Sequence, residues 1–174
     1  MSADSRSLAV TIGLPIIIVP ALPTSAISIW NVKELLEDGH FVSALERKDQ
    51  SAKRPKSVVI AHKDGEKERR YEVFDQPNLL AASDWERVIA VFALGQAWQF
   101  KDWPAQWQSP TDVFNKSCGF FLMFDDESVP LTIKNWDVKV LKISRNKRHL
   151  DSQMQYYFWM YLDQALRTRL AKKL

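Results

Sequence analysis

The sequence predicts a single three-layer α/β domain with a mixed, mostly parallel sheet. Two continuous apolar runs, at 15–20 and 88–94, are typical of strands that are buried on both faces by covering helices. An amphipathic pattern over 151–170 predicts a long helix that packs on such a sheet. With 174 residues and 46% hydrophobic content, the chain has enough material for one core. We expect residues 15–174 to form this domain and residues 1–14 to be a flexible tail.

The first strand, at 15–20, leads into a predicted helix. Thr24 and Ser25 offer an N-cap hydroxyl, and the apolar positions over 27–36 follow a helical period. Gly39 then provides the left-handed conformation that commonly ends a helix. This order predicts a strand, a tight turn and a helix.

The next part of the chain predicts a loop and a hairpin. The stretch 40–56 is polar and basic, which favours a mobile loop. Two short β-branched segments follow, at 57–62 and 70–74. Asp64 and Gly65 form a hairpin signal between them, so we expect an antiparallel pair.

A central strand and two helical segments come next. Residues 83–86 predict a short helical turn, and the strand at 88–94 is central because its side chains do not alternate in polarity. An aromatic loop spans 98–104. Ser109 is the expected N-cap of a helix over 110–116, which has proline at its first position.

Two strands and the long helix complete the chain. The strands are predicted at 120–124 and 137–143, and Asp151 is the expected cap of the last helix. The order of all elements matches a small-GTPase-like, or Ras-like, layout with a mixed sheet.

Composition excludes several classes of protein. The net charge of +3 permits an acidic partner without requiring one. Cys118 is the single cysteine and the three histidines are scattered, so a disulfide framework and a thiolate zinc site are both excluded. No apolar run approaches the roughly 20 residues of a membrane helix, and we expect no membrane partner.

A GTPase-like layout requires a phosphate-binding loop after the first strand. Such loops need glycines for close backbone approach and a lysine for charge. The turn at 20–25 has neither residue type, and Pro20 and Pro23 lack an amide donor. Asn146-Lys147 resembles part of a guanine-binding motif, but His149 stands where that motif needs aspartate. We therefore expect no nucleotide loop.

Other catalytic constellations are weak. Cys118 borders an apolar strand, which favours a buried structural thiol over a nucleophile. The acidic run 125–127 lacks the ligand spacing of a calcium loop. The residues alone therefore predict a non-enzymatic binding module with no cofactor, no metal and no small-molecule substrate.

Five segments carry a specific resemblance. Together they closely resemble the family of the C-terminal domain of parafibromin, the cell-division-cycle subunit of the RNA polymerase II-associated factor complex. The likeness runs from about 15 to the end of the last helix, and the sequence departs from the family pattern mainly over 44–70. The segments, in order, are Pro15-Ile-Ile-Ile-Val-Pro, Asn31-Val-Lys-Glu-Leu-Leu-Glu-Asp-Gly, Asp84-Trp-Glu-Arg-Val-Ile-Ala-Val-Phe, Gly95-Gln-Ala-Trp-Gln-Phe-Lys-Asp-Trp-Pro and Asn146-Lys-Arg-His-Leu-Asp.

This resemblance implies a Ras-like fold that binds no nucleotide. It also implies a nuclear protein that accompanies RNA polymerase II during transcription elongation, with the other subunits of the complex as partners. In the family, this domain helps to bring the complex to chromatin by recognising phosphorylated repeat tails of the polymerase and of an elongation factor.

A phosphorylated, proline-containing tail needs cationic donors and an aromatic surface. Arg87 and Trp98 flank the central strand within the strongest motif, and Lys101 follows the aromatic loop. Lys147 and Arg148 follow the last strand, at the edge where open α/β sheets bind ligands. We predict that these five residues bind the phosphopeptide.

Alternatives remain open for these residues. Trp98 and Phe100 would instead plug the core beneath their loop, and Arg87 would pair with Glu86 or Asp84 as an ordinary surface charge. Nucleic-acid contact through basic loops and exposed tryptophans is the alternative function. The remaining expectation is that four tryptophans are core residues: Trp30, Trp85, Trp136 and Trp159.

Overall fold

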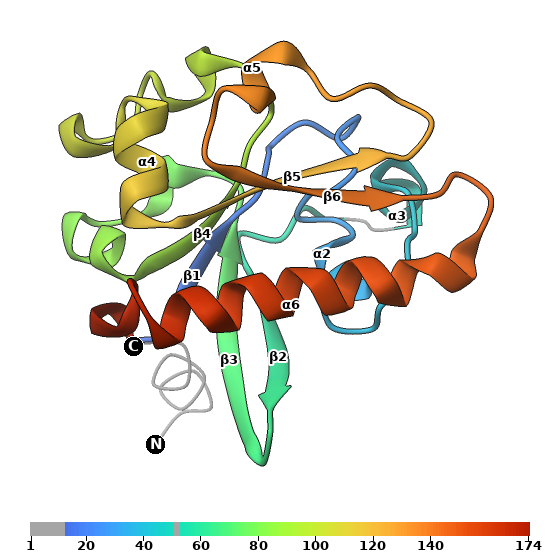
Figure 1. Ribbon diagram of the computed structural model, residues 1–174, viewed down its shortest axis with the longest axis horizontal. Coiled ribbons are helices and arrows are strands. Elements are labelled where there is room, and N and C mark those ends of the chain that lie inside the picture. Colours follow the sequence, from blue (N-terminus) through green and yellow to red (C-terminus); the bar gives the residue numbers. More distant parts are fainter. Residues whose placement is uncertain (1–12, 51–52) are drawn as a thin grey trace.

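The computed structural model describes residues 13–50 and 53–174 and confirms the mixed, mostly parallel α/β fold (Figure 1). Six strands form one sheet in the order β2-β3-β1-β4-β5-β6, and β2 alone runs antiparallel to its neighbour. The strands are β1 (Ile16–Ile18), β2 (Val58–Asp64), β3 (Lys67–Phe74), β4 (Val88–Phe92), β5 (Cys118–Phe124) and β6 (Val138–Ile143). The helices are α2 (Val32–Leu36), α3 (Ala44–Gln50), α4 (Pro110–Lys116), α5 (Leu131–Lys134) and α6 (Asp151–Arg167). Of the predicted tail, only Gly13 and Leu14 lie within the described residues.

The two apolar runs form the centre of the sheet, as predicted. Every residue of β1 and β4 is buried, and the two strands pair in parallel. Successive side chains of a strand point to opposite faces of the sheet, so Ile17 lies in one core cluster and Ile16 and Ile18 lie in the other. One cluster is covered by α2 and α6, and the other by α4 and α5. The sheet is therefore the middle layer of three.

The hairpin is confirmed and is longer than predicted. β2 and β3 pair through the charged residues up to Asp64 and Lys67, which leaves a two-residue turn. Gly65 has a φ of +68° in that turn, a conformation that glycine adopts without a steric penalty. Charged side chains do not prevent extension here because the hairpin tip extends beyond the covering helices (Figure 1).

The helix predicted at 27–36 begins only at Val32, so this part of the prediction was wrong. Asn31 accounts for the difference. Its Nδ2 donates to the carbonyls of Ala26 and Val42, each at 2.9 Å, and its Oδ1 accepts from the Ser28 N–H at 2.8 Å. This buried network holds the segment before α2 as an irregular turn, so Thr24 and Ser25 cap no helix.

The end of α2 follows the prediction and is fastened by the last helix. Gly39 has a φ of +67°. From α6, Gln155 Nε2 donates to the carbonyls of Leu36 and Glu37, and Trp159 Nε1 donates to that of Leu36 at 2.7 Å. A Cβ on Gly39 would lie 2.4 Å from Gln155 Oε1. The glycine therefore permits both the turn and the contact with α6.

Two further predictions fail for tertiary reasons. The stretch 40–56 contains helix α3, which is anchored by an ion pair of 3.1 Å between Arg47 and Glu34. Asp151 begins α6 but does not cap it. Its buried carboxylate accepts the Phe41 N–H at 2.8 Å, a contact that links the start of the last helix to a distant loop.

Candidate functional site

The parallel strands end together at one edge, where the chain order of the sheet reverses. The chain leaves β1 toward β2 and β3 on one side, and leaves β4 toward β5 and β6 on the other. Open α/β sheets bind ligands at such a reversal point, outside the carboxyl ends of the strands. A groove of about 150 Å³ lies there and is lined by Ile18, Val19, Pro20, Ala21, Leu22, Asp75, Pro77, Leu94, Trp98, Gln99 and Trp103.

The turn Trp98-Gln99-Phe100 builds the wall of this groove. Gln99 Nε2 donates to the Phe92 carbonyl at 3.1 Å, and its Oε1 accepts the Leu94 N–H at 2.8 Å, so the turn is braced against the end of β4. Phe100 is fully buried, with its ring 4.9 Å from that of Trp103. The Trp98 side chain is 59% exposed. The alternative that Trp98 plugs the core is therefore excluded, whereas Phe100 does occupy the core.

Trp98 differs from the other six tryptophans in this exposure. Trp85 and Trp159 are buried, as predicted. Trp30 and Trp136 are partly buried and pack against the two core clusters, which places them at the core margin. An exposed indole on a braced turn is a ready-made stacking surface.

The floor of the groove contains an acceptor. Asp75 follows β3, is 4% exposed, and pairs through Oδ2 with Arg54. Its Oδ1 is buried and has no hydrogen-bond partner among the described residues. Because this oxygen is buried, a ligand in the groove would not contact it directly, and the carboxylate charge near the floor, partly offset by Arg54, disfavours a phosphate there.

The turn after β1 fills the position of a phosphate-binding loop. Pro20, Ala21 and Leu22 line the groove with apolar atoms. No helix begins directly behind this turn, because α2 starts only at Val32. The site therefore lacks the aligned amide donors and the helix N-terminus that hold phosphates in nucleotide-binding folds.

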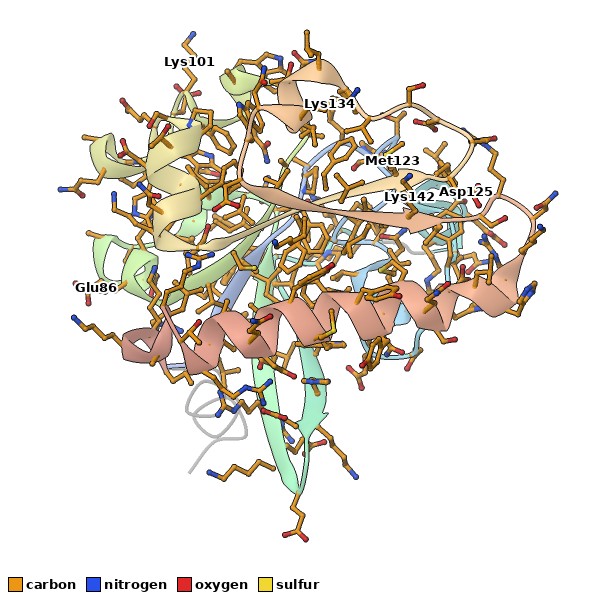
Figure 2. The ribbon with its side chains drawn as sticks, in the orientation of Figure 1. Glu86, Lys101, Met123, Asp125, Lys134 and Lys142 are labelled. Atoms are coloured by element: carbon orange, nitrogen blue, oxygen red, sulfur yellow. The ribbon has the colours of Figure 1, made fainter. Side chains whose placement is uncertain are left out.

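Trp98 and Lys101 are the two predicted residues that the structure brings together. The Lys101 N–H donates to the Trp98 carbonyl at 3.2 Å, so both residues belong to one turn. The Lys101 side chain is exposed and extends from the body (Figure 2). An exposed lysine and an exposed indole therefore belong to the same turn at the carboxyl end of the sheet.

Arg87 lies at the opposite end of β4. Figure 2 labels its neighbour Glu86 far from Lys101. Arg87 Nη2 donates to Asp84 Oδ1 at 2.7 Å, and Nη1 donates to the Leu14 carbonyl. Burial raises the pKa of Asp84, but the Arg87 hydrogen bond, the Ala81 N–H and the Arg87 charge outweigh it and hold that pKa below its ordinary value. The predicted alternative of pairing with Asp84 is thus present.

Lys147 and Arg148 form a third location, after β6. Lys147 is exposed. Arg148 donates to the Ser144 carbonyl, lies 3.4 Å from Asp151 Oδ2, and stacks over the Phe41 ring at 4.7 Å. Of this pair, only Lys147 is free of such contacts with described residues.

Sequence reasoning missed two residues of the groove, Gln99 and Asp75. A glutamine between two aromatic residues gives no signal by itself, because its role depends on the strand end that it bonds. Asp75 follows a strand at the carboxyl edge, and that position was a usable signal.

Other chemistry-bearing residues are engaged elsewhere. Burial raises the pKa of Cys118 to about 11, so it is a thiol at neutral pH. Arg145 forms ion pairs with Asp126 and Glu127 at 2.8 and 2.7 Å, so two carboxylates of the acidic run already have a partner.

Within 13–50 and 53–174, no three His, Cys, Asp or Glu side chains gather as a metal site. The same residues include no helix long and apolar enough to cross a bilayer.

These features define a class: a Ras-like α/β domain without a nucleotide loop, which presents an exposed indole and a lysine at the carboxyl end of its sheet. The chain belongs to the Cdc73 family. The family model described as "RNA pol II accessory factor, Cdc73 family, C-terminal" matches residues 13–165. The resemblance inferred from the sequence is confirmed, and the family supports a transcription-associated scaffold role.

Individual relatives agree. The chain is 42% identical over 164 residues to "Protein CDC73 homolog" of Arabidopsis thaliana and 30% identical over 159 residues to "Cell division control protein 73" of Saccharomyces cerevisiae. These matches cover 90% and 89% of this chain but only 39% of each relative. A solved structure titled "The conserved domain of yeast Cdc73" superposes with a TM-score of 0.80 at 28% identity, covering 89% of this chain and 98% of that one.

Proposed function

We propose that this domain is a non-enzymatic scaffold module that binds phosphorylated repeat tails of RNA polymerase II and of an elongation factor. It would thereby help to bring the polymerase-associated factor complex to chromatin in the nucleus. The exposed, braced Trp98 at the open carboxyl edge carries this proposal, because an indole held outward there has no role in the core.

The groove suggests how a tail divides its contacts. Its walls are prolines, aliphatic side chains and indoles, which suit a proline or an aromatic ring of the tail. The buried Asp75 carboxylate would disfavour a phosphate at the groove floor. The phosphate would then contact Lys101, which is exposed beside Trp98.

The other predicted residues have separate parts in this proposal. Lys147 would meet a second phosphate along an extended tail, and Arg148 would position the loop that presents it. Arg87 precedes β4, whereas Lys101 follows the carboxyl end of that strand, so a direct contact from Arg87 requires a tail that continues to the opposite end of the sheet.

A titration tests the proposal. A fluorescent two-repeat polymerase-tail peptide and its unphosphorylated twin are titrated with the domain at two salt concentrations. A few charge-assisted contacts and one stacking surface predict an affinity of about 1 μM for the phosphorylated form. Trp98→Ala should weaken binding at least about tenfold, an effect of about 1.4 kcal/mol. Lys101→Glu should also weaken binding of the phosphorylated peptide, and the loss should be larger at low salt than at high salt.

The matched control is Lys134→Glu, which makes the same charge change at an exposed lysine on α5. Equal affinity for both peptides would reject the proposal. Random-sequence DNA that displaces the phosphopeptide and binds more tightly would instead favour the nucleic-acid alternative, since bases also stack on an exposed indole.

A further inference from the structure

The sheet has two edge strands, and they differ in how their outer backbone is covered. β2 and β6 lie at the two ends of the strand order. At the β2 edge, Glu37 Oε2 accepts the Ala61 N–H at 3.1 Å, so a side chain blocks that edge. At the β6 edge, no comparable side-chain bond to the strand backbone is found among the described residues.

Alternation shows which backbone groups of β6 are open. The Ile143 carbonyl accepts the Asp125 N–H at 2.9 Å, so Ile143 points its backbone toward β5. The Val138 N–H donates instead to the Trp136 carbonyl, so Val138 points away from β5. Because successive residues of a strand alternate, the N–H and C=O groups of Val140 and Lys142 also point outward.

A groove lies along these open groups. Its volume is about 270 Å³, and residues of both β6 and α6 line it. Tyr157 from α6 forms part of its wall and is 40% exposed, with its ring stacked 6.4 Å from that of Tyr161. The full lining is Val140, Leu141, Lys142, Gln153, Met154, Tyr157 and Tyr161.

Two lysines give this edge its charge. Lys139 and Lys142 are both exposed, and neither takes part in an ion pair with a described carboxylate. Lys139 Nζ lies 5.2 Å from the Tyr161 ring centroid, which places it on the α6 face. Lys142 lies on the other face, because it is three positions further along the strand (Figure 2).

We propose that β6 accepts an extended acidic peptide of a protein partner as a seventh strand. Residues directly opposite one another in a sheet share a face. An added strand would therefore place carboxylates opposite Lys139 and Lys142, three residues apart, with two apolar residues between them opposite Val140 and Leu141. The recognised pattern is acidic-apolar-apolar-acidic, read in either strand direction.

The same lysines would disfavour pairing of this edge with a second copy of itself. Lysines on an edge strand repel a second lysine-bearing edge. A partner with carboxylates at both positions converts that repulsion into attraction. This surface is separate from the groove at Trp98, and its occupant needs no phosphate.

The experiment follows backbone amide signals of the isotopically labelled domain. The probe is a ten-residue peptide with a Glu-Val-Leu-Glu core and glycine-serine ends. We expect saturable shifts at Val140, Lys142 and Tyr157, and at least about fivefold weaker binding by the Lys142→Glu variant. Lys134→Glu serves as the charge-matched control and should bind as the parent does, and Trp98→Ala should also leave binding unchanged.

Backbone methylation of the probe separates strand addition from simple charge attraction. An added strand bonds to the edge through alternate residues only. N-methylation of one alternate set of amides should abolish binding, and methylation of the other set should preserve it. Equal binding of a Lys-Val-Leu-Lys peptide, indifference to the methylation pattern, or shifts centred on Trp98 would each overturn the proposal.

Discussion

The amino ends and the carboxyl ends of the parallel strands both carry basic residues and tryptophans, but the two ends differ in whether these side chains are bonded to the backbone or exposed. At the amino ends, cations are bound to the backbone: Arg87 donates to the Leu14 carbonyl, Arg169 to that of Ser117, and Lys173 to that of Val88. At the carboxyl ends, Lys101 and the Trp98 indole make no such side-chain bonds to described residues and lie exposed. Both ends combine basic groups with tryptophan, and the carboxyl ends also hold engaged cations such as Arg148, yet only the carboxyl ends present an exposed lysine and an exposed indole in one turn.

The difference teaches that a cationic residue near a sheet edge indicates binding only if its donors are free. At the amino end, the Lys173 ammonium lies 4.9 Å from the Trp107 ring centroid, and Lys116 lies 5.6 Å from it. Burial, followed by the charges of Lys116 and Arg169, lowers the pKa of Lys173 to about 8 despite the opposing effect of Glu86. These cations fasten the end of the chain to the sheet.

The largest expected effect is on the free energy of unfolding, and it distinguishes Phe100 from Trp98, the two aromatic residues of one turn. Phe100→Ala should lower the free energy of unfolding by about 3–5 kcal/mol, because it empties a fully buried ring site among Trp103, Phe114 and Trp136. Chemical denaturation followed by tryptophan fluorescence measures this loss.

Trp98→Ala is the matched comparison, two residues earlier in the same turn. It should change stability by no more than about 0.5 kcal/mol, since the side chain is mainly exposed. A loss similar to that of Phe100→Ala would show that the indole has a structural role and would remove the basis of the proposed site.

Arg87 gives the next largest effect. Arg87→Ala should lower stability by about 1–3 kcal/mol, because it removes charge-assisted bonds to Asp84 and to the Leu14 carbonyl. Lys101→Ala, at the other end of β4, should leave the unfolding midpoint unchanged. If Arg87→Ala instead retained full stability and lost phosphopeptide binding, Arg87 would be a direct contact of the tail.

The last prediction concerns pH. The pKa of Lys173 is about 8 in the fold and 10.5 ordinarily, so between these values the unfolded chain binds more protons. Stability should therefore rise with pH from about 8 toward 10.5, and the protonated ammonium should lower stability below 8. Lys173→Met should flatten this rise in denaturation curves recorded from pH 7 to 9.5.

Comparing slopes rather than absolute stabilities isolates Lys173. Burial raises the pKa of Cys118 from 9.0 to about 11, which lowers stability above pH 9. That contribution is common to both proteins and cancels in their difference. Identical slopes for the two proteins would show that Lys173 titrates as an ordinary surface lysine.

Much of the fold followed from short-range patterns. Continuous apolar runs identified β1 and β4, and Ser109 accepts the Asp112 N–H at 3.1 Å as the predicted cap of α4. The failures involve partners distant in sequence. Asn31 bonds the carbonyl of Val42, and Asp151 accepts the N–H of Phe41, 110 residues earlier. No local preference encodes either contact.

The candidate site shows the same division. Sequence identified the aromatic turn but left open which of Trp98 and Phe100 faces solvent, because both are large and apolar. The braces from Gln99 to Phe92 and Leu94 decide this, and they depend on the geometry of the strand end. For Arg87, Asp84 was a foreseeable partner only three residues away, whereas the Leu14 carbonyl was not.

The tip of the β2–β3 hairpin has a practical consequence. It projects past the covering helices (Figure 1), and apart from the two chain neighbours of Gly65 no atom of the described residues lies within 4 Å of a Cβ built on this glycine. Loop tips of this kind tolerate inserted sequence. A short epitope or fluorophore tag placed between Gly65 and Glu66 would extend into solvent, away from the Trp98 groove, and would make the domain traceable while both proposed surfaces stay unobstructed.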